Sequence, residues 1–307
     1  MSWFYIALIG PILYAVTNHI DKYILEKYFK AGEVGAVTLF SALFSVVALP
    51  VIYLIEPAVF SIGIVSTIVL IISGILAVTC LILYLHALRD DEASVVVPFY
   101  QTIPIFGFIL GYFLLGETLG TNEIFASVLI LIGTTIISLD MSGGAIKFKK
   151  RIALLMLLGS FLFAVVGVVF KMIAVDEGFW PSLFWTFTGN VLLGAFIFIA
   201  IKSYRRQFLT VFKVNSVPVL AACSFNEIIF IAADGVSVYA TLLAPIALVM
   251  IVNGFQPVFV FLIGIILTLF FPKLGKESLS KNDLAQKILA IGIISAGTYL
   301  LGMSGAL

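Results

Sequence analysis

The chain has 307 residues and a formal net charge of +1, and 62% of its residues are hydrophobic while only 11% are charged. A soluble domain has roughly a quarter charged residues, so this chain has too few to cover a surface that faces water. Lipid is the solvent that fits this composition. The near-neutral net charge gives no reason to expect a nucleic-acid partner.

Ten apolar runs are long enough to cross a bilayer as helices, since a spanning helix needs roughly 20 apolar residues. The first run is expected to be a retained span rather than a signal peptide, because it has neither preceding basic residues nor a cleavage site. The ten runs lie at about 3–24, 35–55, 64–88, 93–115, 122–139, 152–174, 182–202, 217–241, 245–271 and 287–304. Barrel strands would be about ten residues long and alternating, so an all-α membrane protein is predicted.

Two boundaries along the chain are informative. Residues 217–271 are apolar almost throughout, so two spans must meet there without a charged loop. Proline disfavours helix in the residue before it, and the turn is therefore expected at Leu242-Leu243-Ala244-Pro245. Residues 140–151, DMSGGAIKFKKR, form the clear polar linker between a first five-span segment (1–139) and a second one (152–307).

The two five-span segments share short sequences in the same order. LIGPILYAV at 8–16 matches LLGSFLFAV at 157–165, and PIFGFILG at 104–111 matches PVFVFLIG at 257–264. Two weaker matches follow: GETL at 116–119 with GKESL at 275–279, and Gly133-Thr134 with Gly297-Thr298. These matches predict an internal repeat. Because each copy has an odd number of spans, the second copy is expected to be inserted upside down.

The distribution of basic residues is consistent with this inversion. All lysines and arginines except Lys171 lie at or after the ends of the odd-numbered spans, and none lies between spans 2 and 3, 4 and 5, 6 and 7, or 8 and 9. Lysine and arginine are retained on the cytoplasmic side of a membrane. Both termini are therefore expected outside, in a multi-pass membrane protein.

Together, the five-plus-five repeat, Pro104 and Pro257 in spans 4 and 9, and the Gly116-Glu117 pair resemble the EamA branch of the drug/metabolite transporter superfamily. The second half departs from the pattern, because Lys276-Glu277 stands in place of Gly-Glu. The resemblance implies a cavity between the halves, lined by spans 1, 3, 4, 6, 8 and 9, with spans 5 and 10 at the periphery. It also implies a small-molecule substrate and a location in the plasma membrane, and it leaves open a monomer or a homodimer.

Span 8 carries two carboxylates, Glu227 and Asp234, and Asn226 adjoins the first. Ionisable groups deep in a span are costly and are functional candidates by default. Seven residues are two helical turns, so both carboxylates share one face. They are expected either to bind a cationic group of a substrate or to carry a proton in exchange. The alternative is that Glu227 pairs with Lys171 for stability and that Asp234 is solvated near an interface.

Further polar residues on the spans are candidates for substrate contact or coupling, with interhelical hydrogen bonding as the alternative. Proline can free backbone carbonyls at a mid-membrane site, so Pro104 and Pro257 are expected to act as gating points. The remaining candidates are Tyr14, Asn18 and His19 on span 1, Gln101 on span 4, Lys171 on span 6, and Asn253 and Gln256 on span 9.

The sequence therefore predicts a transporter that moves a small metabolite or drug-like molecule by alternating access, with proton coupling left open. A flippase for a lipid-linked sugar and a non-transporting scaffold are the alternatives. An enzyme is not expected, because HExxH and nucleophile–base motifs are absent from the sequence. Cys80 and Cys223 lie in apolar runs without metal or redox spacing, so neither a metal nor a cofactor is expected.

Overall fold

A computed structural model describes residues 2–28, 34–90, 97–138, 150–214, 216–271 and 281–303. Helices account for nearly all of these residues, and the described part contains no strand. The all-α prediction is therefore confirmed for these ranges. Of the predicted linker 140–151, only residues 150 and 151 are described, and they begin the helix that follows.

Eight segments of the described chain are long and apolar enough to cross a membrane. They coincide with eight of the ten predicted spans. The segments are α1 (Ser2–Tyr28), α2 (Val34–Phe44) continued by η1 (Ser45–Val47) and α3 (Ala48–Ile55), α4 (Ile64–Asp90), α8 (Lys150–Glu177), α9 (Phe179–Ala200), α11 (Ser216–Thr241), α12 (Ile246–Asn253) continued by α13 (Gln256–Phe270), and α14 (Lys281–Met303). A short helix, η2 (Pro57–Phe60), connects α3 to α4.

The predicted fourth and fifth spans are occupied by shorter apolar helices. The fourth consists of η3 (Val97–Thr102), α6 (Ile103–Leu110) and the π-helical turn η4 (Gly111–Leu115), and the fifth is α7 (Thr121–Ser138). A π-helical turn widens the helix locally and is frequent at functional sites.

A helix that the sequence interpretation did not include is α10 (Lys202–Val214). Residues after 202 were predicted only as a basic loop between two spans. They form a helix because their apolar side chains recur at helical spacing, which gives Phe208 and Val211 one common face. The segment is too short and too charged to cross a bilayer, so hydropathy alone does not reveal it.

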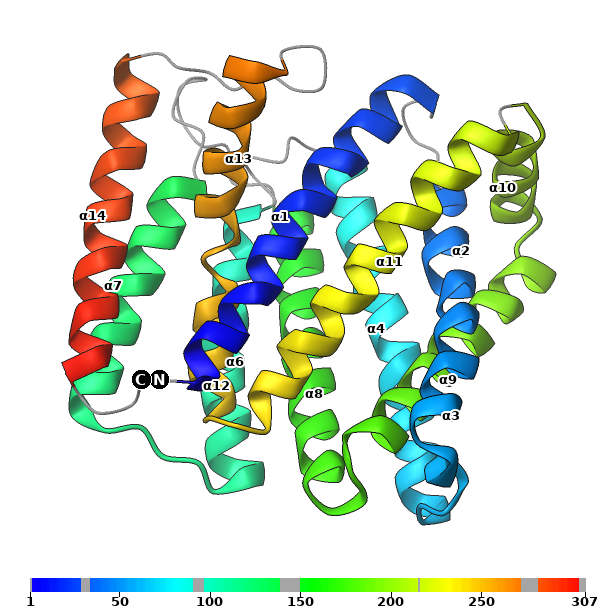
Figure 1. The fold of residues 1–307 in the computed structure, drawn as a ribbon, viewed down its shortest axis with the longest axis horizontal. Coiled ribbons are helices and arrows are strands. Elements are labelled where there is room, and N and C mark those ends of the chain that lie inside the picture. The colour runs from blue at the N-terminus through cyan, green and yellow to red at the C-terminus, as the bar shows by residue number, and fades with distance from the viewer. Residues whose placement is uncertain are drawn as a thin grey trace.

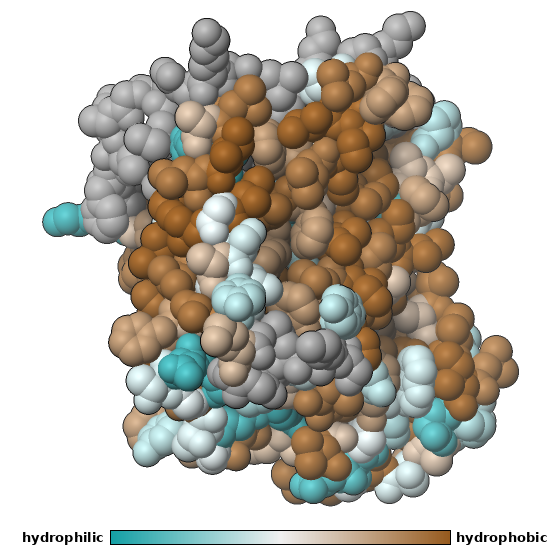
Figure 2. Space-filling view, turned by 60° about the vertical axis from the view of Figure 1, so that its left-hand side comes forward, coloured by the Kyte–Doolittle hydropathy of each residue, from teal (hydrophilic) through white to brown (hydrophobic). Residues whose placement is uncertain are grey.

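The helices run back and forth between two ends of the molecule (Figure 1). The beginning of α1 and the end of α14 lie at the same end, whereas α10 lies at the opposite end. Apolar side chains cover the middle of the face seen in Figure 2, and hydrophilic side chains gather at its lower end. This distribution is the one expected of a protein surrounded by lipid.

Two of the membrane segments are interrupted next to their prolines. In the fourth, α6 directly follows the end of η3, and Pro104 is the second residue of α6. In the ninth, Gly254 and Phe255 separate α12 from α13, and Pro257 is the second residue of α13. Proline fits the first turn of a helix but breaks its interior, which explains both interruptions. The predicted turn at Leu242–Pro245 is also confirmed, because α11 ends at Thr241 and Pro245 is the N-cap of α12.

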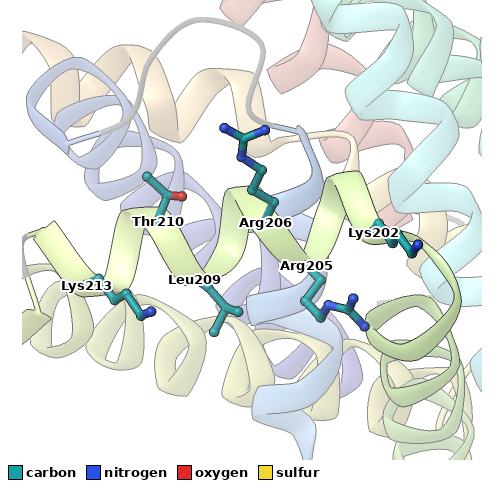
Figure 3. A pocket seen from close by; sticks show the side chains of 6 residues that line it. All are labelled: Lys202, Arg205, Arg206, Leu209, Thr210 and Lys213. Carbon is teal, nitrogen blue, oxygen red and sulfur yellow. The ribbon is translucent and has the colours of Figure 1, made fainter.

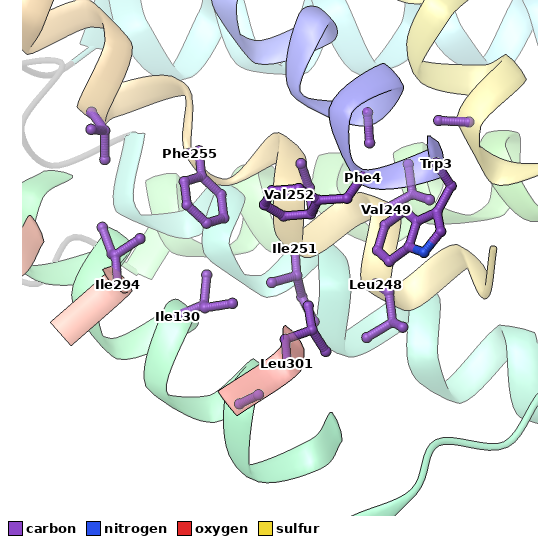
Figure 4. Packing of buried hydrophobic residues seen from close by; sticks show 14 of the residues in the cluster. Trp3, Phe4, Ile130, Leu248, Val249, Ile251, Val252, Phe255, Ile294 and Leu301 are labelled. Carbon is purple, nitrogen blue, oxygen red and sulfur yellow. The ribbon is translucent and has the colours of Figure 1, made fainter. Parts of the chain in front are cut away.

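The helices α7 and α14 pack closely along each other. A Cβ atom added to Gly133 would lie 2.9 Å from the carbonyl oxygen of Ala290, and one added to Gly297 would lie 2.9 Å from that of Ala126. The contact is reciprocal, so each helix needs its glycine for the same close approach. A large apolar cluster joins this pair to α1 and α12 through residues such as Trp3, Ile130, Leu248, Ile294 and Leu301 (Figure 4).

Candidate functional site

The helices α1 and α11 pack antiparallel and exchange two side-chain hydrogen bonds that involve carboxylates. The Tyr14 hydroxyl donates to Oδ1 of Asp234 over 3.3 Å. Seven residues further along α1, Asp21 accepts a hydrogen bond of 2.6 Å from the Asn226 amide. Residues seven apart on α1 share a helix face, and so do Asn226 and Asp234, which are eight apart on α11. One polar stripe of α1 therefore meets one polar stripe of α11.

A third hydrogen bond joins α11 to α2. Oε2 of Glu227 accepts from the Ser41 hydroxyl over 3.1 Å. The carboxylate of Asp21 lies within electrostatic reach of Glu227 and of the Tyr84 hydroxyl. Asp21, Asn226, Glu227 and Ser41 thus meet where α1, α2 and α11 are in contact, and Asp234 lies two turns further along α11, bonded to Tyr14 of α1. We term these residues the carboxylate cluster: Asp21, Ser41, Asn226, Glu227 and Asp234.

The carboxylate cluster has a surplus of acceptors. Among the described residues, no lysine or arginine is paired with Asp21, Glu227 or Asp234. Oδ1 of Asn226 is buried and has no hydrogen-bond partner there. Buried acceptors without partners are rare and usually mark a place for water, an ion or a ligand. A group that brings N–H donors and positive charge would satisfy these atoms.

Aromatic rings flank the cluster. The ring of Tyr14 lies 5.5 Å from that of Phe230, which is on the same helix as the two predicted carboxylates. Tyr84 on α4 and Tyr100 on η3 form a second tilted pair, with centroids 5.2 Å apart. The faces of aromatic rings attract cations, so the rings and the carboxylates favour the same kind of ligand.

Lys171 is engaged elsewhere. It forms an ion pair with Glu117, and its Nζ donates to the carbonyl oxygen of Ala244 over 2.7 Å. Oε2 of Glu117 also accepts from the backbone N–H of Ile246, over 2.8 Å, at the start of α12. The alternative interpretation that Lys171 pairs with Glu227 is therefore wrong. The lysine instead fastens α8 to the end of η4 and to the turn between α11 and α12.

The candidates near the interrupted helices form hydrogen bonds between spans. Oε1 of Gln101 accepts from the buried Thr134 hydroxyl over 2.8 Å, and Oδ1 of Asn253 accepts from Ser237 over 3.3 Å. His19 donates to the carbonyl oxygen of Val260 over 3.0 Å. These contacts are what the alternative interpretation of interhelical hydrogen bonding predicted.

Two further candidates stand apart from the carboxylate cluster. Asn18 is exposed on α1, between Tyr14 and Asp21 in the sequence, and Gln256 is the first residue of α13. None of the described hydrogen bonds involves either of these side chains.

Comparison with known proteins agrees with this architecture. The EamA-like transporter family matches residues 1–139. The resemblance that the sequence predicted is thereby confirmed over residues 1–139, in a chain whose described part has eight helices long and apolar enough to cross a membrane.

The fold similarity extends beyond the matched EamA segment. A solved structure titled "Crystal structure of protein" is similar over 98% of this chain and 96% of its own, with a TM-score of 0.70 and 15% sequence identity. At that identity the likeness concerns the fold alone. No curated protein matches the sequence.

The sequence interpretation missed three residues of importance. Asp21 was not among the candidates, although its spacing of seven from Tyr14 places both on one face of α1. Ser41 carries no signal, because a serine in an apolar span usually bonds to its own helix. Glu117 was noted only as part of the Gly-Glu pair, and its partner Lys171 lies 54 positions away in the sequence, since 171 − 117 = 54.

Proposed function

We propose that this chain transports a small organic cation across the plasma membrane by alternating access. The carboxylate cluster is the observation that carries the proposal. It joins residues of α1 and α2 to residues of α11, so it lies between the first and the second half of the chain. Binding there would couple the ligand to any relative movement of the halves.

The choice of a cation follows from the chemistry of the cluster. Carboxylates in their charged form only accept hydrogen bonds, and the free amide oxygen of Asn226 is a further acceptor. An anionic ligand would be repelled, and a neutral sugar would leave the carboxylates without counter-charge. A protonated amine flanked by the rings of Tyr14 and Phe230 satisfies both the charge and the acceptors.

The proposal includes ten spans arranged as two inverted repeats, 1–139 and 152–307, separated by the linker 140–151. The reciprocal glycine contact between α7 and α14 supports it, since these helices are counterparts in the repeat. The matching interruptions beside Pro104 and Pro257 support it as well. The short fourth and fifth helices then complete the first repeat.

We further propose that both termini lie outside, because α10, with four basic residues, lies at the end opposite the termini. In the transport cycle, the interrupted helices at Pro104 and Pro257 would bend as the halves move against each other. Either Glu227 or Asp234 would exchange a proton for the cation, which makes transport respond to a pH gradient.

Binding is the first property to test. The purified protein in detergent is heated with a panel of cationic, neutral and anionic metabolites, at pH 6 and pH 8. A ligand that binds only the folded state raises the melting temperature. We expect cationic compounds alone to raise it, and the effect to be lost in Glu227→Gln.

Asp176→Asn is the matched control, because Asp176 is an exposed carboxylate near the end of α8, away from the cluster. It should respond as the wild type does. Stabilisation by an amphiphilic sugar lipid instead of a cation would favour the flippase. If a cation raised the melting temperature of Glu227→Gln as much as that of the wild type, the carboxylate cluster would not be its binding site.

A further inference from the structure

The helix α10 has the composition of a surface that binds anions. Its sequence, KSYRRQFLTVFKV, contains four basic residues and no acidic one. These residues line a surface depression of about 300 Å³, shown in Figure 3. The lining consists of Lys202, Arg205, Arg206, Leu209, Thr210 and Lys213.

The opposite face of α10 is fixed to the membrane helices. Oε1 of Gln207 accepts a hydrogen bond of 2.9 Å from the backbone N–H of Gly35 at the start of α2. Phe208 and Val211 pack into an apolar cluster with residues of α1, α2 and α11. A Cβ atom on Gly35 would lie 2.6 Å from the ring of Tyr204, so the two helices are in close contact. The helix therefore presents its basic face in a fixed orientation.

Three of the basic side chains are available to a ligand. In the described ranges, no carboxylate pairs with Lys202, Arg206 or Lys213, and all three are exposed. Arg205 differs, because its Nη1 lies 3.5 and 3.4 Å from the carbonyl oxygens of Phe198 and Ile199 at the end of α9. Unpaired arginine and lysine side chains bind phosphate groups through charge-assisted hydrogen bonds.

The position of α10 indicates which kind of molecule would carry the bound phosphate. The helix starts two residues after α9 ends and stops two residues before α11 begins, so both of its ends are attached to membrane spans. Leu209 is 40% exposed in the middle of the basic lining. A soluble polyanion offers no apolar group that could contact this leucine, whereas a phospholipid brings an acyl chain next to its phosphate.

We propose that α10 is an interfacial helix that binds the phosphate of an anionic phospholipid, with Lys202, Arg206 and Lys213 as its ligands and Leu209 against the acyl chain. Figure 3 shows Arg206 and Thr210 on one edge of the helix and Leu209 and Lys213 on the other. A headgroup held by both Arg206 and Lys213 would therefore lie across the helix. The proposal is independent of the transported substrate.

The test titrates the full-length protein in neutral detergent with dioctanoyl phosphatidylglycerol or dioctanoyl phosphatidylcholine, and counts bound lipid by native mass spectrometry. Each basic residue near an anionic lipid surface is worth about 1 kcal/mol, or about five-fold in affinity. We expect the wild type to prefer phosphatidylglycerol at least ten-fold. The exposed single variant Arg206→Gln should lose about five-fold, and the triple variant K202Q/R206Q/K213Q should lose the preference entirely.

Three controls make the result specific. The triple variant K202R/R206K/K213R keeps the charges and should keep most of the preference. Lys150→Gln removes an exposed positive charge at the start of α8 and should change nothing. Competition by glycerol phosphate at equal concentration would show that phosphate alone is recognised. That result, or equal binding of phosphatidylglycerol by the wild type and the glutamine triple variant, would overturn the proposal.

Discussion

Two helix crossings between the halves differ in what lies at the contact. Where α4 crosses α9, a Cβ atom on Gly74 would overlap the carbonyl oxygen of Thr186, and one on Gly189 would overlap that of Ile71. Where α2 meets α11, the link is the hydrogen bond from Ser41 to Glu227. At the first crossing the two backbones come into direct contact at glycines, and at the second the contact joins two polar side chains.

This difference shows how one architecture can combine a closed contact with a binding site. In the proposed repeat, α4 corresponds to α11 and α9 corresponds to α2, so the two crossings are counterparts. Close packing between small residues supplies helix association in membranes. At the counterpart position, carboxylate and hydroxyl side chains leave acceptors for a ligand. We infer that the α4–α9 crossing is closed in this conformation and that the α2–α11 crossing is the one that receives the cation.

The largest expected effect concerns the ion pair that fastens α8 to the end of η4 and to the turn between α11 and α12. The side chains of Lys171 and Glu117 are only 12% and 17% exposed. Removing one partner of a buried pair leaves an uncompensated charge, which costs about 3 kcal/mol. Lys171→Met should therefore lower the melting temperature in detergent by several degrees. The double variant K171M/E117Q should recover most of the loss, and a double variant as unstable as the single one would contradict this account.

A smaller loss is expected at the close crossing itself. Gly189→Ala adds a methyl group against the backbone of α4, and overpacking costs about 1 to 3 kcal/mol. Thermal unfolding followed by tryptophan fluorescence measures the difference. Gly292→Ala is the matched control, because nothing lies within 4 Å of a Cβ atom there. A Gly189→Ala protein as stable as Gly292→Ala would mean that the α4–α9 crossing is not tightly packed.

The smallest expected effect concerns the hydrogen bond between Ser41 and Glu227 at the α2–α11 crossing. A double-mutant cycle of Ser41→Ala and Glu227→Gln measures the coupling of the two side chains. Interhelical hydrogen bonds in membranes average about 0.6 kcal/mol and rarely exceed about 1.7 kcal/mol. We expect a coupling in this range. Additive effects would indicate that Glu227 does not depend on Ser41 and is held only by its own helix.

Most of the fold was predictable, because lipid imposes long apolar helices and proline marks their ends. Hydropathy located the eight candidate spans, and Pro245 located the turn between α11 and α12. The helix α10 was missed because it is too short and too charged to be found by hydropathy, and its signal is amphipathicity rather than length.

The candidate site was less predictable than the fold. The sequence identified Glu227, Asp234, Asn226 and Tyr14 because polar residues are conspicuous in apolar runs. Their partners come from distant segments, and no local pattern determines which helix lies opposite which. Lys171 illustrates the difficulty, since the sequence suggested Glu227 as its partner, whereas the packing of α8 against η4 brings it to Glu117.

Transport itself is the central claim, and uptake into proteoliposomes tests it most directly. Vesicles containing the wild type, Glu227→Gln or Asp176→Asn are given the radiolabelled cation that stabilises the protein best, with and without an imposed pH gradient. The account predicts uptake above that of protein-free vesicles for the wild type and Asp176→Asn, and none for Glu227→Gln. Binding without uptake in the wild type, or uptake at the wild-type rate in Glu227→Gln, would contradict it.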